Sequence, residues 1–234
     1  RKIRNTFRYL LGNLNDNFEE VDFEKINLSE LPELEQFMLH KIYSLNENFK
    51  NYFNNYDFHN LYKELLNFCT VDLSAFYFDI RKDSLYCDSK DSKKRQATII
   101  LLNVILNSLL KWFAPILSFT TEEIYRLIMN NNKSIHLTKF LHFPISLKNE
   151  NLNQKWLELI KIRNICNISI EEKRASKEIG SSLEASLKIN LDQKLNDILK
   201  DVDFSELCIT SSAEVFYLEN SEINVQTTKA EGSK

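Results

Sequence analysis

The 234-residue sequence is poor in the residues that make tight turns, with three glycines and three prolines. It has no glycine-rich phosphate loop and no locally recognisable Ser/His/Asp or Cys/His arrangement. Its four cysteines lie far apart, with no CxxC pair and no histidine at ligand spacing. That spacing argues against zinc and favours reduced thiols, as in the cytosol. We therefore expect no catalytic residue and no metal ligand in this chain, and a cytoplasmic location.

The sequence also lacks an excess of either charge and a long uninterrupted apolar run. Its 30 basic and 33 acidic residues give a net charge of −3, so any nucleic-acid contact must use local basic patches. The most apolar stretch, residues 97–110, is broken by Asn103, Asn107 and Ser108. We expect a soluble protein that has no membrane partner.

Helix-forming patterns fill the first part of the chain. Apolar residues recur at steps of three and four, which is the spacing of one helix face. With so few turn residues, this pattern predicts a mainly α bundle over residues 1–145. The expected helices cover residues 1–13, 32–52, the stretch from 57 towards 95, 89–114, and 120–128, the last opened by a T-x-x-E capping box.

The pattern changes after about residue 146. A helix from 151 towards 177 is followed by a turn at 179–182. The runs 183–191, 207–210 and 214–218 are β-like, and 192–200 can form a helix. These patterns predict a small α/β module over residues 146–226 and a flexible polar tail at 227–234.

Two basic groups stand out from the helical pattern. Arg1, Arg4 and Arg8 recur at i, i+3 and i+7, which puts them on the polar side of the first helix. The buried face that starts after Asp57 ends in a second cluster around a predicted exposed turn. Its members are Arg81, Lys82, Lys90, Lys93, Lys94 and Arg95. By composition alone, a solvated loop is the simplest interpretation of this cluster.

Several segments resemble one family of enzymes. RKIRNTFRYLLGNLND and DLSAFYFDIRKDSLYCDSKDSKKR resemble the anticodon-binding region of bacterial isoleucyl-tRNA synthetases, and YDFHNLY, KWFAPILSFTTEEIY and IGSSLEAS extend the match in collinear order. The resemblance implies the anticodon-binding helical bundle of class I aminoacyl-tRNA synthetases, followed by a small α/β junction module. The class I signatures HIGH and KMSKS are absent, and the chain opens on a helix without a cap. We therefore expect a C-terminal fragment of a longer enzyme.

The resemblance also implies an activity for that longer enzyme. It would be an isoleucine-tRNA ligase, which attaches isoleucine to its cognate tRNA with ATP and magnesium. It would act as a monomer, with isoleucine tRNA as its partner. The tail resembles the lead into a zinc ribbon, so zinc is expected in the full-length enzyme, but no cofactor is expected in this fragment.

The expected task of this fragment is to hold the anticodon stem and loop. That requires cations on phosphates and hydrogen-bonding or aromatic groups on splayed bases. Asn5 either reads a base edge or fixes the entry of its helix, and both roles remain open. Ser84 stands where many relatives have a second Arg, which puts a phosphate contact there in doubt. Tyr86 could stack on a base or pack under the turn, and packing is favoured. The candidate tRNA-binding residues are Arg1, Lys2, Arg4, Asn5, Arg8, Arg81, Lys82, Lys90, Lys94 and Arg95.

Two alternatives remain at this point. The chain could be the anticodon domain of a sibling class I synthetase for valine, leucine or methionine, because it contains no amino-acid pocket. It could also be a non-catalytic helical RNA-binding protein that shares the domain. Composition and spacing without the resemblance establish only a helical bundle with an α/β appendage.

Overall fold

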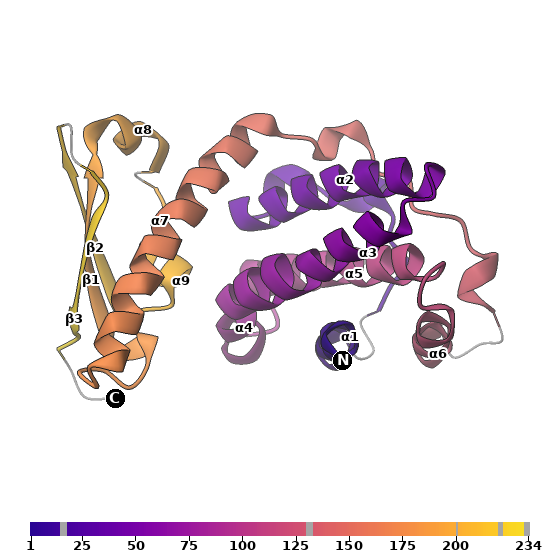
Figure 1. Cartoon of the computed structure of the whole chain (residues 1–234), viewed down its shortest axis with the longest axis horizontal. Coiled ribbons are helices and arrows are strands. Elements are labelled where there is room, and N and C mark those ends of the chain that lie inside the picture. The colour runs from indigo at the N-terminus through magenta and orange to yellow at the C-terminus, as the bar shows by residue number, and fades with distance from the viewer. Residues whose placement is uncertain (15–17, 130–132, 200, 220–221, 232–234) are drawn as a thin grey trace. The chain divides into compact units, whose positions relative to one another are not determined.

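The computed structural model describes residues 1–14, 18–129, 133–199, 201–219 and 222–231 (Figure 1). The chain divides into two compact units, Arg1–Asn149 and Glu150–Lys234. The sequence had placed this division between residues 145 and 146. Each unit has its own core.

The first unit is a bundle of helices, which confirms the mainly α fold class. Short 3-10 turns at Phe23–Lys25, Leu28–Glu30, Ile135–Leu137 and Ile145–Leu147 connect its longer elements. The longer elements are α1 (Lys2–Leu14), α2 (Glu33–Asn54), α3 (Phe58–Asn67), a π-helix (Phe68–Tyr77), α4 (Phe78–Cys87), α5 (Lys93–Phe113) and α6 (Ser118–Met129).

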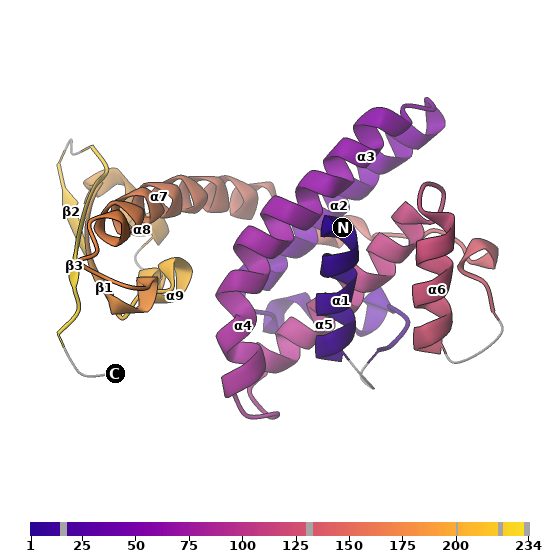
Figure 2. The same cartoon turned by 60° about the horizontal axis from the view of Figure 1, so that its bottom comes forward.

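Helix α5 is the centre of this bundle (Figure 2). It packs against α1, α2, α4 and α6. The Ser92 hydroxyl oxygen accepts the Arg95 backbone N–H and caps the first turn. By length and composition α5 could cross a membrane, although no apolar run of that length was expected from the sequence. However, 72% of its most apolar window is buried inside the bundle. Its hydropathy is therefore that of a core helix.

The stretch after Asp57 forms one continuous rod with a change of helix type in its middle. Asp57 caps α3 by accepting the Asn60 backbone N–H at 3.2 Å. Buried Phe68 and Leu73 are five residues apart, a step too long for one α-helical face but suited to the wider π-helix between α3 and α4. A regular α-helical period was expected here, so the π-helix is a feature that the sequence analysis missed.

Helix α6 begins two residues before the expected capping box. The box required Thr120 to lie outside the helix, whereas α6 starts at Ser118. The Thr121 hydroxyl donates to the carbonyls of Leu117 (3.1 Å) and Ser118 (3.2 Å), inside the first turn. Helix α5 ends at Phe113, just before Pro115, as expected.

The second unit packs helices on one face of a three-stranded sheet. Strand β1 lies between a parallel neighbour, β2, and an antiparallel neighbour, β3. Alternate residues of β1 are buried, and both α7 and α9 pack on the sheet. The elements are α7 (Glu150–Ala175), 3-10 turns at Ser182–Glu184 and Gln193–Leu195, β1 (Ala185–Asp192), α8 (Asn196–Leu199), α9 (Phe204–Cys208), β2 (Ser212–Leu218) and β3 (Asn224–Lys229).

Two segments of this unit differ from the sequence prediction. The first half of the β-like run at 207–210 belongs to α9, because the Asp203 carboxylate accepts the Ser205 and Glu206 N–H groups and starts a helical turn. Strand β3 extends to Lys229, so residues 227–229, expected in the flexible tail, pair with β1. Residues 232–234 of that tail lie outside the described part of the chain.

Candidate nucleic-acid interface

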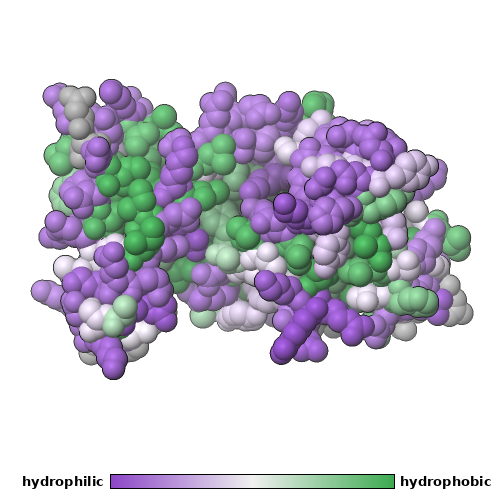
Figure 3. Space-filling model, in the orientation of Figure 1, coloured by the Kyte–Doolittle hydropathy of each residue, from purple (hydrophilic) through white to green (hydrophobic). Residues whose placement is uncertain are grey.

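The polar face of α1 carries half of the predicted site. Ile3, Phe7 and Leu10 are buried and fix the rotation of this helix in the bundle. At 100° per residue the opposite side then turns to solvent. The structure exposes all five of the α1 candidates, which are Arg1, Lys2, Arg4, Asn5 and Arg8. The surface around the N-terminus is accordingly hydrophilic (Figure 3).

These α1 side chains make few ion pairs or hydrogen bonds with the described residues. Arg4 contacts Glu123 of α6 at 3.1 Å, but the two side chains are 66% and 62% exposed. Such a pair contributes little and can exchange for a phosphate. No described acidic group pairs with Arg1, Lys2 or Arg8. The Asn5 side chain makes no hydrogen bond to a described residue, so no contact supports the helix-entry role considered for it.

Arg81 does not belong to this surface, and its assignment to an exposed basic corner is wrong. Its side chain is buried, at 3% exposure for the residue. Nε and Nη2 donate to Oε1 and Oε2 of Glu35 at 2.7 and 2.8 Å, and Glu35 is itself 0% exposed. The Tyr77 hydroxyl donates to the same Oε1 at 2.9 Å. The guanidinium thus ties α4 to α2, and it is unavailable to a nucleic acid.

The remaining basic residues surround the turn between α4 and α5, which we call the corner (residues 88–92). The Ser92 hydroxyl donates to Asp88 Oδ2 at 2.9 Å, and Arg95 Nη1 donates to the Asp88 carbonyl at 2.7 Å. Lys90 is exposed and pairs with no described acidic group. Lys82, on α4, contacts Asp79 at 3.0 Å in a partly exposed pair. The fourth predicted cation, Lys94, is half-buried.

The two basic groups lie near each other in the fold. Tyr9 of α1 stacks on Phe78, the first residue of α4, with ring centroids 4.2 Å apart. Asn13, at the end of α1, lines the same cavity as Lys90 and Arg95. Figure 2 shows α1 beside α4, with α6 on its other side. The fold therefore brings the end of α1 next to a corner that lies about eighty residues later in the sequence.

Two neighbouring residues bear on the expected contacts. Ser84 is buried, and a short buried side chain cannot reach a phosphate in solvent, which agrees with the doubt raised by the sequence. Tyr86 is 65% exposed, so the expectation that it packs under the turn is wrong. Its ring is available to stack on a base. Tyr86 directly follows the apolar residue Leu85, which is buried, and this position could have indicated from the sequence that Tyr86 faces solvent.

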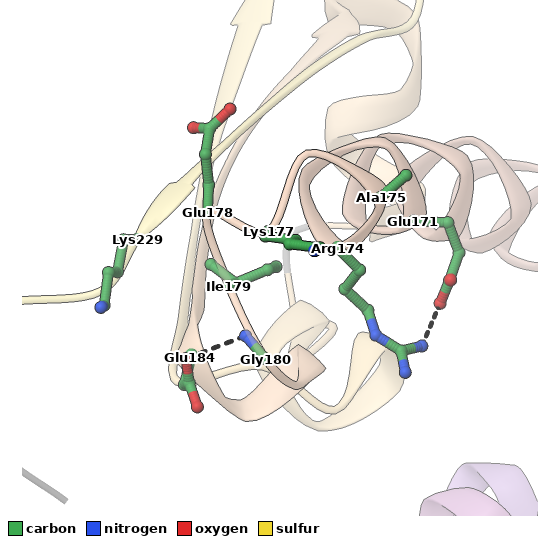
Figure 4. A pocket seen from close by; sticks show the side chains of 9 residues that line it. All are labelled: Glu171, Arg174, Ala175, Lys177, Glu178, Ile179, Gly180, Glu184 and Lys229. Atoms are coloured by element: carbon green, nitrogen blue, oxygen red, sulfur yellow. Dashed lines mark hydrogen bonds and ion pairs between the residues drawn. The ribbon is translucent and has the colours of Figure 1, made fainter.

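A second cavity, of about 580 Å³, lies in the other unit where α7 ends (Figure 4). Its cations are Arg174, Lys177 and Lys229, and its acids are Glu171, Glu178 and Glu184. Arg174 is held by Glu171 at 2.5 Å, and the Glu184 carboxylate accepts the Gly180 N–H at 3.0 Å. The acids offset the cations, so this cavity offers a nucleic acid no net positive charge.

The described residues offer no metal centre. Within them, no group of three or more His, Cys, Asp or Glu side chains is arranged to hold an ion. Burial raises the pKa of the Tyr77 hydroxyl well above its ordinary value, and the nearby Glu35 carboxylate adds to this shift. Tyr77 thus remains a neutral donor to that carboxylate. The exposed cations of the first unit are suited to binding an anionic ligand.

Comparison with known proteins gives the family. Residues 35–189 match the family described as the anticodon-binding domain of tRNA ligase. The chain is 68% identical over its whole length to the isoleucine–tRNA ligase of Pelagibacter ubique, of which it covers 26%. It is 41% identical over 92% of its length to the enzyme of the same name from Agrobacterium fabrum, and 37% identical over its whole length to that of Bartonella henselae, of which it covers 22% and 25%.

The chain thus spans about a quarter of the length of these relatives. The family match begins within α2, at residue 35, and runs through the bundle into β1. Helix α1 lies outside that match but inside the alignment with the Pelagibacter enzyme. By its fold and by this match, the chain belongs to the anticodon-binding domain family of tRNA ligases.

Proposed function

We propose that this chain binds the anticodon stem and loop of isoleucine tRNA, as part of an isoleucine–tRNA ligase. The observation that carries the proposal is the set of exposed cations on α1 and at the corner, of which Arg1, Arg8 and Lys90 have no described ion-pair partner. Cations free of acidic partners gain most from a phosphate, because no existing pair has to be broken. The isoleucine specificity is supported by the names of the relatives.

Within this surface the residues have different proposed tasks. Arg1, Arg4 and Arg8, which α1 presents in one row, contact phosphates along the stem, and Lys2 contacts a phosphate beside that row. Lys82, Lys90, Lys94 and Arg95 contact phosphates nearer the loop. Asn5 has both a donor and an acceptor in its amide and can read a base edge. Phosphate contacts fix register and affinity, whereas base contacts supply identity.

The longer enzyme would attach isoleucine to this tRNA with ATP and magnesium. The share of the relatives that the chain covers supports placing that chemistry in other domains. A zinc ribbon would likewise lie outside the described residues. The monomeric state remains a prediction from the resemblance, and the cytoplasmic location remains a prediction from the spacing of the cysteines.

The salt dependence of binding tests the phosphate contacts. The double variant Arg4→Ala/Arg8→Ala should weaken binding of isoleucine tRNA and lower the slope of log K against log salt by about 1.5, since each phosphate contact contributes roughly 0.7 to 0.9. The matched control is Lys50→Ala/Lys63→Ala, which removes the same charge from α2 and α3. A folded Arg4/Arg8 variant that keeps the wild-type slope would remove α1 from the interface.

A further inference from the structure

A cavity of about 460 Å³ lies where the end of α1, the corner and the start of α5 meet. We call it the corner pocket. Its lining includes the cations Lys90 and Arg95 and the amide side chains of Asn13, Gln96 and Asn103. Its volume falls within the range of small-ligand sites. These three amide residues are separate from the α1 cations that are assigned to phosphates of the stem.

The wall of the corner pocket is held in place by side chains of α5. Asn103 Oδ1 accepts the Glu19 backbone N–H at 3.0 Å, and Asn107 Nδ2 donates to the Glu19 carbonyl at 3.0 Å. Both groups of one backbone residue are thus fixed to one helix. Arg95 is fixed in turn by the Asp88 carbonyl. A ligand would therefore meet a preformed site, which reduces the ordering cost of binding.

The pocket offers mainly acceptors and an apolar wall. Asn13 Nδ2 donates to the Tyr9 carbonyl at 2.9 Å, and Gln96 Nε2 donates to the Lys90 carbonyl at 3.4 Å. Each side chain thereby keeps its amide oxygen for a ligand. The Glu19 carboxylate is a further acceptor, and Ile99 and Ile100, the latter 40% exposed, supply an apolar surface.

This combination matches a nucleobase joined to its phosphate. The flat face of a base suits the isoleucine side chains, and an exocyclic amino group donates to amide or carboxylate oxygens. The Lys90 ammonium has no described ion-pair partner, and among the described residues the Arg95 guanidinium donates only from Nη1, so both remain available to a phosphate. The cavity at the end of α7, by contrast, is lined by as many acidic as basic side chains.

We propose that the corner pocket holds one unstacked nucleobase with an exocyclic amino group, from the loop of the bound RNA. The inference rests on the proposed function, because the cations around the pocket are those assigned to the loop phosphates. It adds a base-reading site in which Gln96, Asn13 and Glu19 provide the hydrogen-bond acceptors. None of these three was among the sequence candidates.

The test uses the whole chain and a synthetic hairpin with the sequence of the anticodon arm of isoleucine tRNA. Each loop nucleotide is replaced in turn by an abasic site, and the dissociation constant is measured by fluorescence anisotropy. Gln96→Trp fills the pocket from an exposed position of α5, and Gln154→Trp on α7 is the matched control. Loss of one stacked base typically weakens binding about tenfold.

At one loop position, the effects of Gln96→Trp and of the abasic site on the dissociation constant should not add. Wild type and Gln154→Trp should each lose about tenfold at that position. Gln96→Trp should bind the intact hairpin about tenfold more weakly and lose less than about twofold further when that base is absent. In wild type, replacing that base by an analogue without its amino group should also weaken binding.

Other outcomes overturn the proposal. If Gln96→Trp binds the intact hairpin as wild type does while Arg4→Ala/Arg8→Ala weakens binding, the pocket is not a base site and the proposed function stands. If Gln96→Trp lowers the affinity and the salt slope but keeps every abasic penalty, the pocket holds only a phosphate. If neither variant changes binding, both the pocket and the proposed function fail.

Discussion

Replacing Arg81 should destabilise the bundle far more than replacing any exposed cation. Arg81→Met leaves the Glu35 carboxylate buried without its charge partner, and breaking such a pair costs about 3–5 kcal/mol. The neighbouring Lys82→Met is the control, because it removes a partly exposed pair worth at most about 1 kcal/mol. The two substitutions remove one positive charge from adjacent positions. The difference between their free energies of unfolding therefore reports the effect of burying the ion pair.

Replacing the whole buried pair by apolar side chains should recover most of the free energy of unfolding that Arg81→Met loses. In Glu35→Leu/Arg81→Met the buried charge is gone, but the Tyr77 hydroxyl loses its acceptor and retains a penalty of about 1–3 kcal/mol. Adding Tyr77→Phe removes that donor as well. The triple variant should therefore be more stable than Arg81→Met, since apolar replacement of a whole buried pair is often neutral or stabilising.

The assay is urea unfolding followed by the fluorescence of Trp112. Trp112 is buried in the bundle, and Trp156 belongs to the other unit, so every variant is made in a Trp156→Phe background. The reasoning fails if Arg81→Met and Lys82→Met change the free energy of unfolding by similar amounts. It also fails if the triple variant is less stable than Arg81→Met alone.

Two further predictions concern ionisable groups. The hydrogen bond from the Ser134 hydroxyl (2.8 Å), helped by Arg126, lowers the pKa of Glu122 in the folded state. Its contribution to stability is therefore present above the ordinary pKa of about 4.3 and is lost as the pH falls. Glu122→Gln should make the thermal midpoint less sensitive to acid, and an unchanged pH profile would contradict this. For the thiols, burial raises the pKa of Cys69 to about 12, whereas Cys87 is exposed. Cys87 should react first with Ellman's reagent in the native chain, and rapid labelling of Cys69 would contradict the buried position.

Sequence periodicity predicted the helices whose burial follows a local rule. The spacing of Ile3, Phe7 and Leu10 fixed which side of α1 faces solvent, and the exposure of Arg1, Arg4 and Arg8 followed from it. Lys90 is exposed because it lies in the turn between α4 and α5. These parts of the site depend on neighbours within a few residues, so a single sequence contains the information.

The parts that the sequence did not predict depend on distant partners. Arg81 is buried because Glu35, 46 residues earlier, faces it across the bundle. Its position four residues after Tyr77, on the buried side, was a local signal, but its charge argued for solvent. The corner pocket likewise requires Glu19 to be held by Asn103, which lies 84 residues later. Helical spacing along one segment cannot reveal such pairs.

The central claim is that the α1 face and the corner recognise the anticodon arm of isoleucine tRNA. The most direct test is a binding titration of this chain with isoleucine tRNA and with an anticodon-swapped version, each at two salt concentrations. The account predicts tighter binding of the cognate tRNA and a steep salt dependence for both. Equal and weak binding of the two tRNAs would contradict the claim that this surface reads the anticodon.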